Sequence, residues 1–208
     1  MGKIKKDIKN LSKESGSKVK ARRAAESWFE KASKSIKDKS VAKYSKPFKV
    51  GMIHVFRYEK PKHIKTLLWW DMNPVVLALD THPSGTDVGI NLNLLPVQFK
   101  EDLLDMIYDN MEGQIKSKSG RSKENDALSQ GEIKLIYKDA VEFLRRFGFD
   151  FAIRQYIPQL KKNQKVVSYE HWAKIALCDY QDLYGIGINE VKRSFAEHLK
   201  TRSKRKDI

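Results

Sequence analysis

The 208-residue sequence has a single cysteine, Cys178. A lone cysteine excludes a disulfide framework and a cysteine-based zinc site within one chain. No apolar run approaches the roughly 18 residues that a membrane span requires. The lysine-rich start is not followed by the apolar segment of a secretory signal. These absences predict a soluble protein that is intracellular or part of an assembly.

Patterns that would identify an enzyme are also missing. The five histidines form no helical His-x-x-x-His or Glu-x-x-His pair of the kind that binds zinc. Asp71, Asp80 and Asp87 could converge on a divalent cation as in a nuclease, but each lies near a turn-forming proline or glycine, so we favour a turn role. Cys178 ends an apolar helical stretch and is predicted to be a buried, inert thiol. The sequence thus predicts no catalytic residue, no metal site and no cofactor.

What the sequence does have is positive charge, and this charge is unevenly distributed. The net charge is +15. Residues 1–46 contribute +10 and residues 191–208 contribute +5, whereas residues 47–190 carry 19 basic and 19 acidic side chains. Basic segments of this kind bind nucleic acid, acidic protein surfaces or anionic membranes. The membrane is disfavoured because position 6 is Lys, where a myristoylation signal has Ser or Thr. We favour nucleic acid over a protein contact.

The first basic segment has the pattern of two helices. Ile4, Ile8 and Leu11 form one apolar stripe, and after a Ser/Gly break a mostly alanine stripe follows with Trp28 and Phe29 as its largest members. Trp28 and Phe29 could stack on bases, but we predict that they dock on the body of the protein or on a partner. The predicted DNA-binding cations of the two basic segments are Lys3, Lys5, Lys6, Lys9, Lys18, Lys20, Arg22, Arg23, Lys31, Lys34, Lys192, Arg193, Lys200, Arg202, Lys204, Arg205 and Lys206.

The neutral middle begins as β structure and continues as helices. Residues 51–58, 75–81 and 88–92 are rich in β-forming residues and separated by turn signals, which predicts a three-stranded meander in a small, curled sheet or partial barrel. A helix is predicted from Pro96, a flexible excursion at 113–127, and a helix from the capping box of Ser129 to Gly148. Residues 149–157 fit a strand or a helix equally well. Ser168 is predicted to cap a short helix, and Lys161 and Lys162 to be surface residues.

The predicted fold class is therefore α+β: a small antiparallel β meander packed with helices, with a basic helical N-terminal arm and a basic C-terminal helix. The predicted division is an arm at 1–46, a body at 47–190, and a basic helix and tail at 191–208. Trp69 and Trp70 are adjacent, so that in a strand one faces the core and the other faces outward. We take Trp70 as a candidate protein contact, together with Trp28 and Phe29.

Several segments of the body resemble a known family. They are GMIHVFRYEKPKHIKTLLWWDMNPVVLAL at 51–79, GINLNLLP at 89–96, RRFGFDFAIRQYIPQLKKNQKVV at 145–167 and YEHWAKIAL at 169–177. This pattern is similar to virion proteins of T-even-type tailed phages that are described as DNA end protectors. The similarity covers roughly residues 47–180, and the basic N-terminal segment resembles the family in character.

The resemblance implies a non-enzymatic phage virion protein that binds DNA without sequence preference through its basic termini, as a DNA end protector or in head–tail completion. Its partners would be the DNA phosphate backbone and other virion proteins of the head, neck or tail, with no membrane and no small-molecule substrate. It would be located in the virion, which is assembled in the host cytoplasm. The alternative is a purely structural tail, neck or baseplate component whose basic arms clamp neighbouring subunits.

Overall fold

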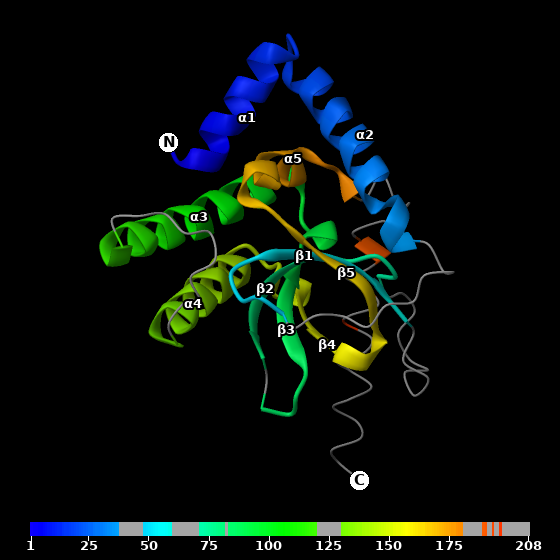
Figure 1. Cartoon of the computed structure of the whole chain (residues 1–208), viewed down its shortest axis with the longest axis vertical. Coiled ribbons are helices and arrows are strands. Elements are labelled where there is room, and N and C mark those ends of the chain that lie inside the picture. The colour runs from blue at the N-terminus through cyan, green and yellow to red at the C-terminus, as the bar shows by residue number, and fades with distance from the viewer. Residues whose placement is uncertain are drawn as a thin grey trace.

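The computed structural model describes residues 1–37, 48–59, 71–81, 83–119 and 130–180, together with 189, 190, 193 and 196. The helices are α1 (Lys3–Glu14), α2 (Lys18–Lys37), α3 (Val97–Ser119), α4 (Gln130–Arg146) and α5 (Trp172–Leu177). The strands are β1 (Ile53–Tyr58), β2 (Val75–Thr81), β3 (Asp87–Asn91), β4 (Ile153–Tyr156) and β5 (Lys161–Val167). This arrangement confirms the α+β class (Figure 1). No helix in the described ranges is long and apolar enough to cross a membrane.

The five strands form one antiparallel sheet in the order β4-β3-β2-β1-β5. Strands β1 to β3 are the predicted meander, and β4 and β5 add one strand to each side of it. Gly89 allows β3 to lie close to β2, since a Cβ atom at this position would come within 2.3 Å of Val76 Cγ1 and 2.8 Å of the Leu77 carbonyl oxygen.

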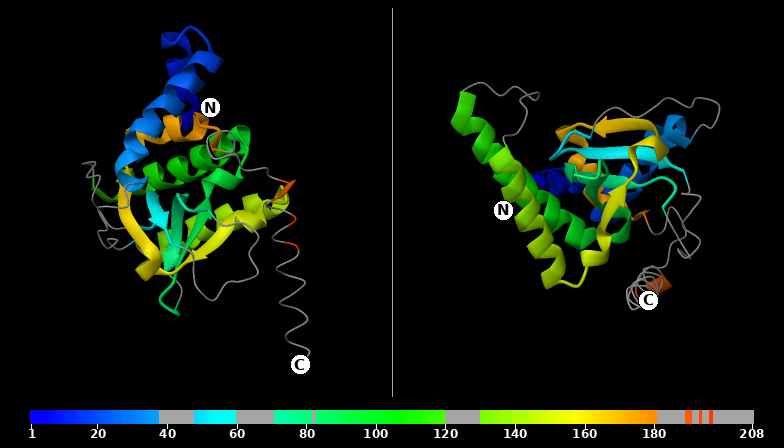
Figure 2. Two further views of the ribbon diagram at one scale, coloured as in Figure 1. Left: turned by 90° about the vertical axis from the view of Figure 1, so that its right-hand side faces the viewer. Right: turned by 90° about the horizontal axis from the view of Figure 1, so that it is seen from below.

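The connection between β4 and β5 requires the sheet to curl (Figure 2). The outer strands of a flat five-stranded sheet would be separated by about 19 Å. Only residues 157–160 join these two strands. A fully extended link of this length spans at most about 17 Å, and this link spans less because Pro158–Leu160 is a 3-10 turn. The curl brings the Tyr156 ring within 5.3 Å of the Tyr58 ring, and the Ile157 N–H donates to the Tyr58 hydroxyl at 3.1 Å.

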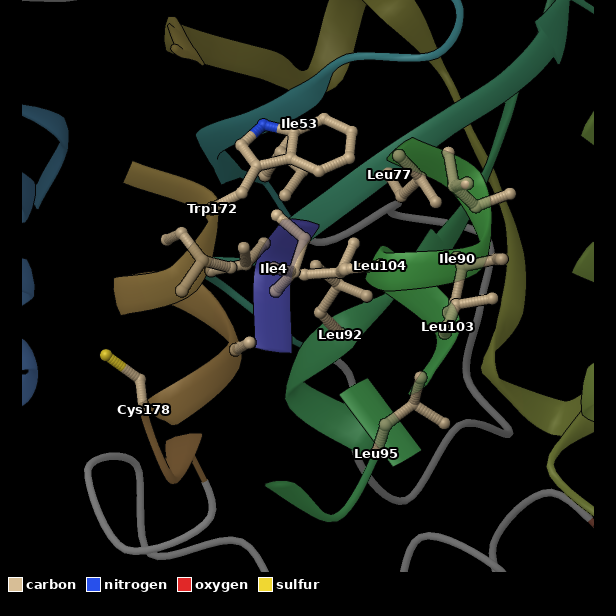
Figure 3. Packing of buried hydrophobic residues seen from close by; sticks show 14 of the residues in the cluster. Ile4, Ile53, Leu77, Ile90, Leu92, Leu95, Leu103, Leu104, Trp172 and Cys178 are labelled. Carbon is tan, nitrogen blue, oxygen red and sulfur yellow. The ribbon is translucent and has the colours of Figure 1, made fainter. Parts of the chain in front are cut away.

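The sheet has a different apolar cluster on each face. The inner cluster contains Phe48, Phe56, Tyr58, Val76, Ala78 and Tyr156. On the outer face, alternate strand residues such as Ile53, Leu77 and Ile90 pack against the helices in the larger core. In Figure 3, Ile4 of α1 lies between Trp172 of α5 and Leu104 of α3. The first helix of the basic segment is therefore part of the main core.

Several predicted details of the body differ from the structure. The helix predicted from Pro96 begins at Val97, and Pro96 contributes its carbonyl oxygen to the Phe99 and Lys100 N–H groups. The excursion predicted at 113–127 was wrong for 113–119, which continue α3; its remainder lies outside the described residues, as does the capping box at Ser129. Gly148, with φ 71°, follows the end of α4 as predicted.

Two predictions after residue 157 were also wrong. Ser168 makes no side-chain capping bond to the backbone; its hydroxyl donates to Glu170 Oε1, and a 3-10 turn precedes α5. Lys161 is not a surface residue: it begins β5, is 1% exposed, and its Nζ binds Asp87 Oδ2 beneath the Phe48 and Phe56 rings. The sequence suggests a surface pair because two adjacent lysines rarely enter a core, and here the buried carboxylate of Asp87 compensates the charge.

Candidate nucleic-acid interface

The helices α1 and α2 form an inverted V, here called the V, above α5 and α3 (Figure 1). Their apolar sides bury Ile4, Ile8, Ala21, Ala25 and Phe29 in the same core as the sheet and α3. The alanines keep the contact surface of α2 flat, so its backbone lies close to the body. The basic N-terminal segment, up to residue 37, is thus fixed on the folded protein. The predicted boundary at residue 46 falls outside the described residues.

The start of α1 is bound to a carboxylate of α3. Asp105 Oδ1 accepts hydrogen bonds from the backbone N–H groups of Ile4 at 2.9 Å and Lys5 at 3.4 Å. These N–H groups lack partners within their own helix, and the helix dipole favours an anion at this end. Gly2 makes room for the carboxylate, because a Cβ atom at residue 2 would lie 2.3 Å from it.

The far part of the V is bound to the residues on either side of α5. The Trp28 ring lies 4.7 Å from that of His171, and the Phe29 ring lies 5.0 Å from that of Tyr180. These contacts are the predicted docking of Trp28 and Phe29 on the body. The other candidate contact, Trp70, lies outside the described residues.

A buried lysine also supports this junction. Lys100 of α3 is fully buried, donates to the Cys178 carbonyl oxygen and stands 4.3 Å from the centre of the Tyr180 ring. Burial lowers the pKa of Lys100 to about 8. Cys178 itself is a buried free thiol, as predicted, and burial raises its pKa to about 12.

Four of the predicted DNA-binding cations have carboxylate partners within the chain. Lys3 pairs with Asp7 at 2.9 Å, Lys5 with Asp102 at 2.7 Å, and Lys18 with Glu101 at 2.8 Å. Arg22 binds both Glu26 at 2.9 Å and Asp179 at 2.8 Å. The partly buried Arg22 joins α2 to the residues that follow α5, whereas the three lysines keep roughly half of their side-chain surface exposed.

The remaining cations of the V point away from the body. They are exposed, and none forms an ion pair within the described part of the chain: Lys6, Lys9, Lys20, Arg23, Lys31 and Lys34. Lys13, which the sequence reasoning missed, is exposed on the same face of α1 as Lys6 and Lys9; its spacing of four residues from Lys9 was the available signal.

Less of the second basic segment is described. Arg193 is helical and exposed. Lys192, Lys200, Arg202, Lys204, Arg205 and Lys206 lie outside the described residues.

The three aspartates that could have formed a metal site do not converge. Asp71 accepts hydrogen bonds from the side-chain amides of Asn91 and Asn93 and from the Asn73 N–H. Asp87, at the opposite end of β3, is bound to Lys161, and Asp80 is exposed near Thr81. Burial raises the pKa of Asp71. Among the described residues, no group of three or more His, Cys, Asp or Glu side chains could hold a metal ion.

A groove lies beside α1, on another side from Lys6 and Lys9. Its volume is about 470 Å³. Its aromatic lining residues are Tyr108 and Tyr169. Its charged lining residues are three carboxylates and two lysines: Asp7, Glu14, Glu170, Lys3 and Lys174. The carboxylates outnumber the cations, so this groove is less suited to DNA than the outward faces of α1 and α2.

Together, the curled sheet, the helical layer and the docked basic V define an α+β protein with an outward-facing cationic surface. The sequence matches the model of a family described as "Phage T4 terminal DNA protecting protein" over residues 1–195. The chain belongs to this family, which confirms the resemblance to phage DNA end protectors. No curated protein and no solved structure matches the chain.

Proposed function

We propose that this protein protects the ends of phage DNA by binding the phosphate backbone with the outward cations of α1 and α2, and that it does so in the virion without catalysis. The observation that carries the proposal is the set of exposed cations on two helices fixed to the core, none of them in an ion pair within the described part of the chain. The family's description as a DNA protecting protein supports it.

The mechanism is electrostatic. Each lysine or arginine that neutralises a phosphate releases condensed counterions, which gives affinity without base recognition. A bound protein then covers the duplex near its end and sterically blocks an exonuclease. Lys3, Lys5 and Lys18 also contribute in this proposal, although less, because each is already neutralised by a carboxylate. Arg193 and the neighbouring C-terminal cations would add a second contact.

This proposal predicts a strong dependence on salt. With about six phosphates engaged, log K should fall with log salt concentration at a slope near −5. Replacing Arg23, Lys31 and Lys34 by Gln should reduce the magnitude of this slope by about 3 and weaken binding to all sequences equally. Fluorescence titration of a labelled duplex between low and physiological salt measures both effects.

The matched control replaces three exposed cations of α4 by Gln, namely Lys138, Arg145 and Arg146. It removes the same charge from another surface and should change the slope little. Protection of linear duplex DNA from an exonuclease should be lost in the first triple variant and kept in the second. A wild-type slope of magnitude below about 2, or equal effects of the two triple variants, would contradict the proposal.

A second candidate function is the structural one, in which this part of the protein clamps a neighbouring virion protein. The groove beside α1 favours it, because aromatic side chains and an excess of carboxylates suit a protein segment that carries basic residues. Glu14→Lys and Glu170→Lys would then reduce incorporation into particles while DNA affinity stays the same or rises. Normal incorporation of this double variant would exclude the groove as the contact.

A further inference from the structure

The outward cations of α2 lie on one face of the helix. Lys20, Arg23, Lys31 and Lys34 are three, eight and three residues apart, with Ser27 between the two pairs. Residues three or four apart share a helix face, so that all five positions form one stripe. The opposite face carries Ala21, Ala25 and Phe29 in the core. We call these four cations and Ser27 the α2 stripe.

The α2 stripe is divided into two cationic pairs. A helix advances by about 1.5 Å per residue, which places Arg23 about 12 Å from Lys31 along the axis and Lys20 about 21 Å from Lys34. Between the pairs, the exposed residues are Ala24 and Ser27, which are short, and Glu30, an acidic residue at the edge of the stripe next to Lys31 and Lys34. The acidic Glu26 does not interrupt the stripe, because it faces Arg22 and the Asp179 N–H.

This spacing corresponds to the major groove of B-DNA. That groove is about 12 Å wide, and the minor groove is about 6 Å wide. The two cation pairs begin about 12 Å apart along the helix, and their long side chains can reach outward to the phosphates on both edges of the major groove. To contact both edges of the narrower minor groove, the side chains of both pairs would have to fold inward. Ser27 at the centre of the stripe is short, which allows the helix backbone to approach the groove, and Glu30 projects to one side, about 60° around the helix axis from Ser27.

We propose that α2 crosses the major groove of a DNA duplex, with Lys20 and Arg23 on the phosphates of one strand and Lys31 and Lys34 on those of the other. This inference rests on the proposed DNA-binding function and adds the mode of binding, in which α2 engages both phosphate rows of a duplex across its major groove. A single strand lacks two phosphate rows held at a fixed distance, so it engages the two pairs less well.

The experiment compares a 20-base-pair duplex with a single strand of the same sequence, using fluorescence anisotropy at several salt concentrations. Two double variants are used, Lys20→Gln with Arg23→Gln and Lys31→Gln with Lys34→Gln. Arg145→Gln with Arg146→Gln on α4 is the control of equal charge. A circular dichroism melt confirms that each variant is folded.

We expect the wild-type protein to bind the duplex more tightly than the single strand at each salt concentration. Either α2 double variant should reduce the magnitude of the duplex slope by about 2 and remove most of the preference for duplex.

Equal affinity for both substrates, or equal losses on both in the α2 variants, would overturn the groove-crossing inference while DNA binding itself stands. Absence of salt-dependent binding to any DNA would instead overturn the proposed function on which the inference rests.

Discussion

At the scale of single residues, a buried histidine in the sheet interior has hydrogen-bond partners at both of its ring nitrogens. His54 of β1 is fully buried, with its Nε2 3.1 Å from both the Lys49 N and the Lys49 carbonyl oxygen, and its Nδ1 2.9 Å from Gln164 Nε2. Burial lowers the pKa of His54 to about 4, and the positive charges of Lys161 and Lys49 add to this effect. The folded protein therefore holds this histidine neutral.

This residue predicts a loss of stability in mild acid. Between pH 6.5 and 4 the unfolded chain binds a proton at His54 that the native state does not, so the free energy of unfolding falls as the pH decreases through this window. The full effect is roughly 3 kcal/mol. Urea unfolding at pH 7, 5.5 and 4.5 measures it, and His54→Gln should show a shallower dependence. Parallel pH profiles of the two proteins would contradict the assignment.

At the scale of elements, α1 depends on a carboxylate from another helix. Asp105→Ala removes the acceptor of two N–H groups at the start of α1 and should lower the free energy of unfolding by about 1–2 kcal/mol. Asp102→Ala, one turn earlier on α3, removes the exposed ion pair with Lys5 and should cost at most about 1 kcal/mol. Chemical denaturation of both variants tests the contrast, and equal losses would show that the capping bonds are unimportant.

Elements with a local signal could be predicted from the sequence, and those formed by distant pairing could not. The β-rich runs of β1 to β3 and the apolar periodicity of α1, α2 and α4 are visible in short windows. Strand β5 has the sequence KKNQKVV, whose polar residues favour no strand. It becomes one because β1 and a buried carboxylate on β3 lie beside it. The sequence of β4 fits a strand and a helix equally well, and its pairing with β3 makes it a strand.

The candidate site, too, could be predicted from the sequence only where its signal is local. The sequence located the cations of α1 and α2, but charge alone could not separate those that point outward from those that bind the body. Lys5 and Lys18 pair with acidic residues about a hundred and about eighty positions later, on α3. Arg22 pairs with Asp179, which is more than 150 positions later in the sequence. Such pairings depend on the packing of α3 and α5 against the V, which short-range patterns do not contain.

At the scale of the whole molecule, the basic N-terminal helices are part of the folding unit. Ile4, Ile8, Ala21, Ala25 and Phe29 share one core with the outer face of the sheet, α3 and α5. A chain that begins at residue 47 would therefore expose Trp172 and other members of this core. We expect it to lack a cooperative thermal transition and to bind a hydrophobic dye. A melting temperature equal to that of the full chain would contradict this expectation.

This result also changes how DNA binding should be tested. Deletion of the N-terminal segment would remove charge and fold together, so loss of binding by the shortened chain would not identify the contact. Substitution of outward cations by Gln leaves the buried face of each helix intact. The charge-matched variants on α4 then control for the general effect of net charge on binding to a polyanion.

The small side chains of Ala21 and Ala25 have a consequence for how this surface could change over evolutionary time. A larger residue at either position would push α2 away from α5 and tilt its outer face, because cores accommodate added volume by shifting the backbone. The spacing of the outer charges relative to α1 would change although no charge had been altered. Under the proposed DNA-binding function, residues that never meet a phosphate would thus constrain the shape of nucleic acid that the surface can accept.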